Sequence, residues 1–571
     1  MTVSERTWWK EGTVYQVYPA SFKDSNCDGV GDIPGILSSL DYIKDLGVDI
    51  IWVCPFYESP QVDMGYDISN YEDVYAPYGT LADVQALISA CHQREMRVIF
   101  DLVINHTSDL HPWFKESRSS KTSSKRDWYI WRPAKYDKDG NRKPPNNWRS
   151  HFSGSAWTWD EATQEYYLHL FATEQPDLNW ENKETREAIY QSSMIFWLEK
   201  GVDGFRIDTV NMYSKDPELR NARIGQPELE DQLAVDLFCN GPRMYEYLKE
   251  MNDVLAPYDT MTVGELPNTP AVEKVLTYVS AIEKRLNMVF NFDAVYLGQG
   301  KEARFITYPY TLADLKKALS KWQTSIIGND AWTTSFLENH DQGRSISRFA
   351  SDLPEYRVAS GKMLSILTTT LSGTLFVYQG QEIGMINAKD WPIEEYKCIK
   401  SRGYYRQVKK LTNGDPAALA AALRGIQEVG RDHARTPMQW SASANAGFTK
   451  DGVKPWMRVH DDYATINVAS QVGDPNSILS FWKRMIKLRQ EYKNLFIYGD
   501  YEVYNVENVE TYIFSKSCKE ERMLIVLNFT DEEKTFEKPA KLKGGLNLLV
   551  SSVNDPKQAL APYEGRLYLI K

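Results

Sequence analysis

Short apolar runs recur along the first two thirds of the chain, and stretches with helical spacing of apolar positions alternate with them. The runs cover residues 13–18, 48–53, 97–104, 202–207, 261–264, 288–292, 335–337 and 374–378. Near-continuous apolar strands that alternate with helices are typical of a parallel sheet covered on both faces. Eight such units predict an α/β fold with a closed (β/α)8 TIM barrel, and an open doubly wound sheet is the alternative.

Two segments interrupt this alternation and a third ends it. Residues 107–171 are rich in Trp, Pro, Asn, Lys and Ser, which predicts a small inserted domain after strand three. A long disordered loop is the alternative, but the tryptophans oppose it. From residue 498 the apolar positions alternate with period two, which predicts an antiparallel β-sandwich. We therefore expect a barrel at 1–106 and 172–497 with a helical excursion at about 383–457, an inserted domain at 107–171 and a C-terminal domain at 498–571.

Composition and charge exclude several classes of protein. The chain has 571 residues and is 42% hydrophobic, and its aromatic content of 13% opposes disorder. The net charge is −11 and no basic stripe appears, so neither nucleic acid nor an anionic membrane is an expected partner. No apolar run is long enough to span a bilayer, and the first residues lack the apolar core of a secretory signal.

Cysteine usage agrees with an intracellular protein. The six cysteines lack paired spacing, which indicates buried thiols and neither a disulfide framework nor a zinc site. We expect a cytoplasmic protein without an organic cofactor. A monomer and a homo-oligomer are equally compatible with the sequence.

Charged side chains follow several of the predicted strands at the point where each strand ends. Catalytic groups of such barrels lie at the carboxyl ends of the strands, so these side chains are expected to meet at one mouth. They are Asp101, Asn105, His106, Arg206, Asp208, Glu265, Glu338, Asn339, His340 and Asp341. Singly, each has an ordinary structural interpretation, such as a helix cap or a satisfied core histidine. Together they indicate a catalytic cluster, because buried charges are costly unless they are paired.

Three carboxylates beside an arginine suit glycoside hydrolysis, which needs a proton donor and a carboxylate to capture the oxocarbenium-like centre. Arg206 lies two residues before Asp208 on the same strand face, so it should lower the pKa of that carboxyl and keep it ionised. Glu265 follows Val263 and Gly264 in a less polar setting, which suits an acid that keeps its proton near neutral pH.

Four segments at these strand ends resemble a known family. They are DLVINHTSD (101–109), GFRIDTV (204–210), GELP (264–267) and ENHD (338–341). Further matches are GVGDIPGI (29–36), QPDLNW (175–180) and HARTPMQW (433–440). With them the chain resembles, over essentially its whole length, the α-amylase family (glycoside hydrolase family 13), in the branch of α-glucosidases and oligo-1,6-glucosidases that includes the fungal maltases.

The resemblance implies a role for each matching residue. Asp208 is the expected nucleophile, Glu265 the general acid/base and Asp341 the stabiliser of the transition state. The expected sugar contacts are Asp63, Tyr66, His106, Phe152, Phe171, Arg206, Thr209, His340 and Arg431. Asp63 and Tyr66 should close one end of a pocket, with Phe152 and Phe171 at its rim. The choice between Arg431 and Arg435 stays open.

The first loop begins like a calcium loop, with oxygen-bearing side chains at alternate positions and Gly29 at the sixth. Position twelve is Gly35 where an EF-hand has Glu, and a strand precedes the loop, so it is no EF-hand. The resemblance implies a structural cation, Ca²⁺ with Mg²⁺ as the alternative. Its ligands would be Asp24, Asn26, Asp28, the Val30 carbonyl and Asp32. An Asx-rich turn without metal is the competing interpretation.

The resemblance also bears on the substrate. It implies exo-action on short α-glucosides such as maltose and short malto-oligosaccharides, through a retaining mechanism. In fungal relatives Thr after the nucleophile goes with α-1,4 bonds and Val with α-1,6 bonds, and this chain has Thr209. Transglucosylation is expected as a side activity. The alternatives are an oligo-1,6-glucosidase, an enzyme that isomerises or transfers glucosyl groups, and, from a different class, a catalytically silent transporter-associated relative.

Overall fold

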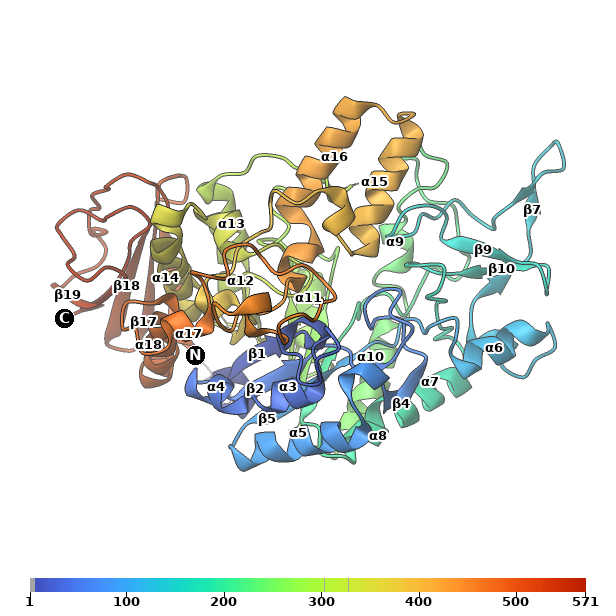
Figure 1. The fold of residues 1–571 in the computed structure, drawn as a ribbon, viewed down its shortest axis with the longest axis horizontal. Helices are drawn as coiled ribbons and strands as arrows, with labels where there is room; N and C mark the ends of the chain where they lie inside the picture. Colours follow the sequence, from blue (N-terminus) through green and yellow to red (C-terminus); the bar gives the residue numbers. More distant parts are fainter. Residues whose placement is uncertain (1–5, 302, 327) are drawn as a thin grey trace.

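A parallel barrel forms the centre of the protein in the computed structural model, which describes residues 6–301, 303–326 and 328–571 (Figure 1). Its eight strands form one sheet in the order β13-β12-β11-β5-β2-β1-β15-β14. They are β1 (Thr13–Val17), β2 (Ile50–Val53), β5 (Arg97–Leu102), β11 (Gly204–Ile207), β12 (Met261–Glu265), β13 (Met288–Phe290), β14 (Thr334–Ser335) and β15 (Thr374–Tyr378). The predicted (β/α)8 barrel is confirmed.

Parallel pairing extends from β1 in both directions around the barrel. Val14 lies opposite Ile50 of β2 and opposite Phe376 of β15. Between β13 and β14 the described strands form no ladder, but the hydroxyl of Thr334 donates to the carbonyl of Val289 at 3.2 Å and closes the gap. Strand β14 is shorter and begins earlier than the predicted 335–337, because it has a ladder partner on one side only.

Large rings fill the barrel interior and account for part of the aromatic content. Trp52 stacks on Phe290 with 5.6 Å between ring centroids, and Phe290 meets Phe376 at 4.7 Å. Such offset and edge-on pairs stabilise a core beyond the area they bury.

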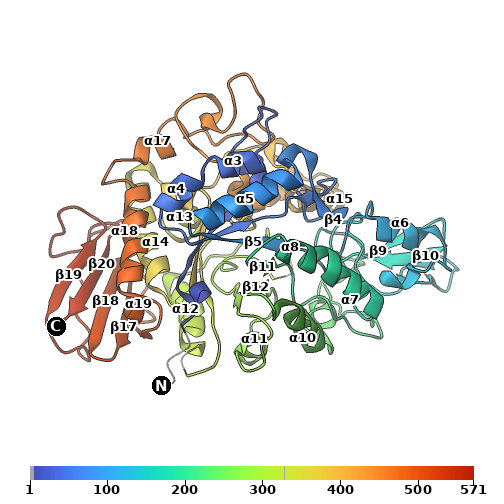
Figure 2. The ribbon, with the colours of Figure 1, turned by 90° about the horizontal axis from the view of Figure 1, so that it is seen from below.

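Helices cover the outside of the barrel (Figure 2). They include α3 (Ile33–Leu37), α4 (Leu40–Asp45), α5 (Leu81–Gln93), α7 (Lys183–Ile189), α8 (Phe196–Leu198), α10 (Met244–Leu255), α11 (Val272–Val279), α12 (Leu312–Ser325), α13 (Ser345–Phe349), α14 (Pro354–Thr370) and α18 (Ile478–Glu491). Helix α5 begins where the sequence permits a capping box, with Thr80 and Asp83 each accepting a backbone hydrogen bond from the other.

The insertion after β5 folds into a small domain at one side of the barrel (Figure 1). It contains α6 (Pro112–Ser119) and a three-stranded sheet in the order β6-β10-β9. These strands are β6 (Trp131–Arg132), β9 (Trp157–Asp160) and β10 (Glu165–Leu168). The predicted excursion after β15 contains the helical pair α15 (Ile399–Leu411) and α16 (Pro416–Val429). No helix among the described residues is both long and apolar enough to cross a membrane.

The C-terminal region is antiparallel, as predicted, and forms one five-stranded sheet in the order β16-β17-β18-β20-β19, where the prediction was a sandwich of two sheets. The strands are β16 (Asp500–Tyr504), β17 (Thr511–Cys518), β18 (Glu521–Asn528), β19 (Leu546–Ser551) and β20 (Gly565–Ile570). Alternate residues of β18 face opposite sides: Ile525 packs into the main core, whereas Leu524 and Val526 join an outer cluster with Leu542 and Leu560. Connecting segments therefore cover the face that a second sheet would cover in a sandwich.

Candidate active site

One guanidinium holds three carboxyl groups together at the carboxyl ends of β5, β11 and β12. Arg206 Nη1 lies 2.6 Å from Asp101 Oδ1 and 2.8 Å from Asp208 Oδ1, and its Nη2 lies 2.8 Å from Glu265 Oε2. All four side chains are buried. The strand register brings them together, because Arg206 pairs with Asp101 across one ladder and β12 lies on the other side. The predicted meeting of strand-end charges at one mouth is confirmed for these groups.

The two expected catalytic carboxyls prefer different protonation states near neutral pH. Burial raises the pKa of Asp208 to about 6, and Arg206 opposes the rise. Burial raises the pKa of Glu265 further, to about 8, again against Arg206 and with help from the charges of Asp208 and Asp341. Arg206 thus favours an ionised Asp208 as predicted, but burial outweighs it. At pH 7 Asp208 is mostly ionised, whereas Glu265 is mostly protonated.

Asp341 is the third carboxylate and lies in a cationic setting. Its Oδ1 lies 2.5 Å from Arg435 Nη2 and 3.4 Å from Arg431 Nη1. Although burial opposes ionisation, the guanidiniums of Arg431 and Arg435 hold the pKa of Asp341 well below its usual range. Asp341 therefore stays ionised at every pH at which the other two carboxyls titrate.

Asp63 lines the cavity next to Arg431, with which it forms an ion pair. Arg431 Nη2 lies 2.9 Å from Asp63 Oδ1, so a single guanidinium links Asp63 to Asp341. Arg431 also lines the cavity, whereas Arg435 contacts Asp341 and the carbonyl of His340 from behind it. Between the two arginines left open by the sequence, the structure therefore places Arg431 at the pocket surface.

A chain of hydrogen bonds from Gln16 through His340 holds the ring of Tyr66 in place. The amide of Gln16 lies 2.7 Å from His340 Nδ1, and His340 Nε2 lies 2.6 Å from the hydroxyl of Tyr66. Since an amide nitrogen only donates, the His340 proton is on Nε2, and the hydroxyl of Tyr66 donates a hydrogen bond to Asp101 Oδ2 at 3.1 Å. Burial lowers the pKa of His340 well below its usual range, which keeps the ring neutral. His340 is thus a satisfied buried histidine as well as a neighbour of Asp341.

Thr209 is strained beside the nucleophile. Its φ is +39°, an unfavourable conformation for a β-branched residue. Its hydroxyl donates to Asp208 Oδ2 at 3.2 Å and its amide to Glu265 Oε2 at 3.3 Å. The strained turn therefore supplies two hydrogen bonds to the carboxyl pair.

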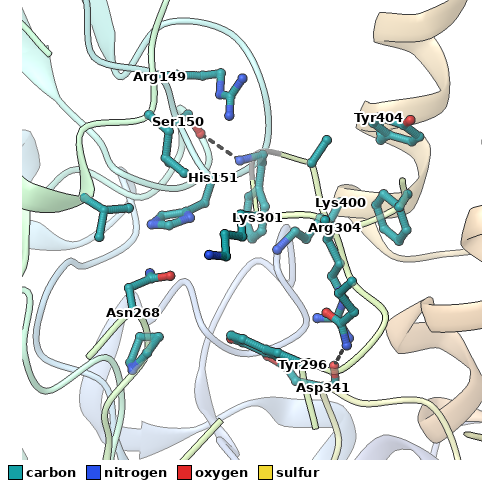
Figure 3. Close-up of a pocket in the computed structure, with 18 of the residues that line it drawn as sticks. Arg149, Ser150, His151, Asn268, Tyr296, Lys301, Arg304, Asp341, Lys400 and Tyr404 are labelled. Carbon is teal, nitrogen blue, oxygen red and sulfur yellow. Dashed lines mark hydrogen bonds between the residues drawn. The ribbon is translucent and has the colours of Figure 1, made fainter. Parts of the chain in front are cut away.

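A cavity of about 1010 Å³ lies at this mouth of the barrel, and Figure 3 shows part of its lining, including Asp341. Most of the predicted residues are part of its wall. They are Asp63, Tyr66, His106, Phe152, Phe171, Asp208, Thr209, Glu265, Asp341 and Arg431. Arg206 and His340 lie behind the wall and hold its residues in place. His106 is anchored through Nε2, which lies 2.9 Å from the carbonyl of Tyr66.

Several lining residues carried no signal in the sequence. Tyr296, Arg304 and Lys400 lie on segments outside the strand ends, and only the fold brings them to the cavity. Gln175, which lies behind the wall 3.1 Å from the carbonyl of Tyr66, is part of QPDLNW and could have been chosen from that match. Asp101 was visible as a strand-end charge but had no assigned role.

The first loop adopts the arrangement of an Asx-rich turn. Asp24 Oδ1 accepts the backbone amides of Asn26 and Cys27, and its Oδ2 accepts that of Gly29. Asp32 accepts the amide of Ser25 and caps α3 through Gly35. Among the described residues no group of three or more His, Cys, Asp or Glu side chains is placed to hold a metal ion. The carboxylates in this conformation fit the turn better than a cation cage, and the cation stays a prediction.

The fold and the site together define a class. Buried carboxyls of opposite protonation preference at the mouth of a (β/α)8 barrel form the arrangement that acid-assisted cleavage of a glycoside requires. Comparison with known proteins agrees: the α-amylase catalytic domain matches residues 16–499. The chain belongs to the α-amylase family.

Individual relatives match over nearly the whole chain. An α-glucosidase of Candida albicans is 53% identical, with 100% of each chain covered. An oligo-1,6-glucosidase of Saccharomyces cerevisiae is 47% identical, with 99% of each covered. The structure of isomaltulose synthase from Erwinia rhapontici NX5 superposes with a TM-score of 0.93 at 37% identity, covering 99% of each chain.

Proposed function

We propose that the protein is a retaining, exo-acting α-glucosidase that releases glucose from the non-reducing end of short α-glucosides. The observation that carries the proposal is the Arg206 cluster, which holds Asp208 and Glu265 side by side with different protonation states. Both carboxyls contact the terminal nitrogens of one guanidinium, so little room is left between them. Retaining glycosidases have such closely spaced carboxyls, whereas inverting ones leave room between them for a water molecule. The α-glucosidases and oligo-1,6-glucosidases among the relatives support the same class of reaction.

The proposed reaction has two steps. Asp208 attacks the anomeric carbon while Glu265 gives its proton to the glycosidic oxygen, which forms a β-glucosyl-enzyme and frees the aglycone. Glu265, now ionised, takes a proton from water as the water attacks, and glucose leaves with its α-configuration retained. Asp341, which stays ionised, stabilises the positive charge of the transition state and holds sugar hydroxyls.

The closed end of the cavity supports exo-action. We expect Asp63, Tyr66 and Arg431 to close the cavity beyond one glucose unit; all three line it, and Asp63 and Arg431 form an ion pair. His106 and Phe171 complete the glucose contacts, and Phe152 lies at the rim against Arg431, 5.4 Å from its guanidinium. Arg206 and His340 act on glucose through the wall residues that they hold.

Thr209 supports a preference for α-1,4 bonds because its hydroxyl reaches the nucleophile. The alternative is an oligo-1,6-glucosidase, because a protein of that name is 47% identical to this chain and the α-glucosidase is 53% identical. Rates on maltose, isomaltose and sucrose distinguish a maltase from an isomaltase and from a sucrose-isomerising enzyme. A silent transporter-associated relative is disfavoured, because all three carboxyls and the arginines that bind them are present.

The decisive experiment follows maltose hydrolysis by NMR. We expect α-glucose as the first product, a loss of at least about a thousandfold in kcat for Asp208→Asn, and transglucosylation products at high maltose concentration. β-Glucose as the first product, or full activity of Asp208→Asn, would refute the mechanism.

Two further expectations belong to this proposal. The loop from Asp24 to Asp32 offers oxygen donors to a structural Ca²⁺, and metal analysis of the purified protein after dialysis tests for it. The free state of all six cysteines supports a reducing, cytoplasmic compartment, which cell fractionation tests.

A further inference from the structure

Beyond the carboxyl cluster, one corner of the cavity is positively charged. Lys400 on α15 and Arg304 both line the cavity and lie close to each other on its wall (Figure 3). Both are half-buried, whereas Lys301 and Leu411 nearer the mouth are exposed. The two cations therefore lie on the cavity wall beside Asp341, whose carbonyl Arg304 contacts.

Both cations have unused hydrogen-bond donors. Among the residues that the structure describes, Lys400 has no hydrogen-bond partner and no ion-pair partner. Arg304 uses Nη2, which donates to the carbonyl of Asp341 at 2.7 Å and to the side chain of Gln342 at 3.2 Å, and its Nη1 has no hydrogen-bond partner among the described residues.

The described acids that line or face this corner are paired elsewhere or exposed. Asp341, which acts electrostatically on both Lys400 and Arg304, is already paired with Arg431 and Arg435. Asp293 is turned to Lys321, at 2.7 Å. Two other lining acids, Glu228 and Asp236, are exposed to solvent.

Just before α15, the backbone amides of Lys397 and Cys398 already donate to Asp432, as does the hydroxyl of Ser401. Lys400 and Arg304 are charged donors on the cavity wall at this corner. Burial and, after it, the neighbouring guanidiniums lower the pKa of Lys400 to about 7, and a bound anion would favour its charged form.

We infer that Lys400 and Arg304 form a subsite for an oxyanion on the leaving group, so that the enzyme accepts α-glucosides whose aglycone carries a carboxylate or a phosphate. The inference rests on the proposed glucosidase function, since it assigns the leaving-group side of the same cavity. An ammonium and a guanidinium with free donors bind such groups through charge-assisted hydrogen bonds, which are about twice as strong as neutral ones.

The test compares maltobionate with maltitol, because both are α-1,4-glucosides of an open-chain aglycone and differ by one carboxylate. The wild-type enzyme should cleave maltobionate with a kcat/KM about tenfold higher than maltitol at low salt. Lys400→Gln should lower this ratio about tenfold and Lys400→Arg should preserve it. Lys409→Gln removes an exposed cation from the same helix and should keep the wild-type ratio. Maltose phosphorylated on its reducing sugar, compared with maltose, tests the phosphate separately.

Several outcomes would overturn the inference. A wild-type ratio of one or less for both the carboxylate and the phosphate would do so, and so would an equal loss on maltobionate and maltitol in Lys400→Gln, which indicates a structural role. Failure to cleave maltose and maltitol at all would instead refute the glucosidase proposal. Calorimetric binding of both compounds to Asp208→Asn then still measures the preference without turnover.

Discussion

The charge of Asp101 should set the acidic limb of the pH profile. The proposed mechanism requires an ionised Asp208 and a protonated Glu265, so kcat/KM should rise as pH passes about 6 and fall as it passes about 8. Asp101 shares Arg206 with Asp208, and its negative charge raises the pKa of Asp208. Burial raises the pKa of Asp101 itself to about 6, so the two carboxyls titrate together and only part of this charge is present on the acidic limb. Asp101→Asn removes that charge while it keeps the size of the side chain.

The size of the shift follows from the geometry. The carboxylates of Asp101 and Asp208 contact the same Arg206 nitrogen, at 2.6 and 2.8 Å. Their oxygens therefore lie about 5 Å apart, where two charges repel by roughly 3 kcal/mol at an effective dielectric constant of about 20. That energy equals about two pKa units, and relaxation of the site reduces it. We expect the acidic limb to move down by about one to two units, to between about 4 and 5.

The assay is kcat/KM for 4-nitrophenyl α-glucoside from pH 4 to 10 at constant ionic strength. Its readout is the position of the limb, so a lower absolute rate does not affect it. Asp49→Asn is the matched control, because Asp49 is a half-buried carboxyl at the opposite end of the barrel that accepts a hydrogen bond from the amide of Thr13. An acidic limb that stays near 6 in Asp101→Asn would refute the electrostatic coupling. A shift of the acidic limb to higher pH would show that the charge of Asp101 does not raise the pKa of Asp208.

Three other substitutions test the specificity, the pocket wall and the C-terminal domain. Thr209→Val removes the hydroxyl that reaches the nucleophile and should raise the isomaltose-to-maltose rate ratio about tenfold; an unchanged ratio contradicts the role of Thr209. Arg431→Lys cannot bridge both carboxylates, so KM for maltose should rise about tenfold, and a value within twofold of wild type argues against the bridge. Ile525→Ala, fully buried in β18, should lower the unfolding free energy by about 2–5 kcal/mol, measured by thermal denaturation, whereas the more exposed Leu548→Ala should have little effect.

The barrel could be predicted because its strands carry a local signal. A strand covered on both faces is apolar throughout, and a polar residue at its end stands out, which is why Asp208 and Glu265 were found from the sequence. The strand boundaries were less certain: β14 contains two residues, because the ladder on its β13 side is missing. Ladder pairing depends on the partner strand, and a single segment does not reveal its partner.

The leaving-group side of the cavity could not be predicted. Arg304 and Lys400 are nearly a hundred residues apart in segments without strand signals, and they meet only because α15 lies over the barrel mouth. The single five-stranded sheet at the C-terminus is a similar case. The alternation along a strand shows which residues share a face of the sheet, but it does not show what packs on that face. The sequence of β18 therefore cannot show whether strands or connecting segments cover Leu524.

Arg206 explains why two carboxyls bound to one cation can do opposite tasks. The guanidinium lowers the pKa of Asp208 and Glu265 alike, so it cannot by itself separate them. The difference between the two pKa values comes from the remaining neighbours. The negative charges of Asp208 and Asp341 raise the pKa of Glu265 further, and a hydrogen bond from Glu265 favours an ionised Asp208. In the proposed mechanism the charge of Asp208 is lost when its carboxylate bonds to glucose, so the pKa of Glu265 should fall. The loss of that charge would by itself turn the acid of the first step into the base of the second.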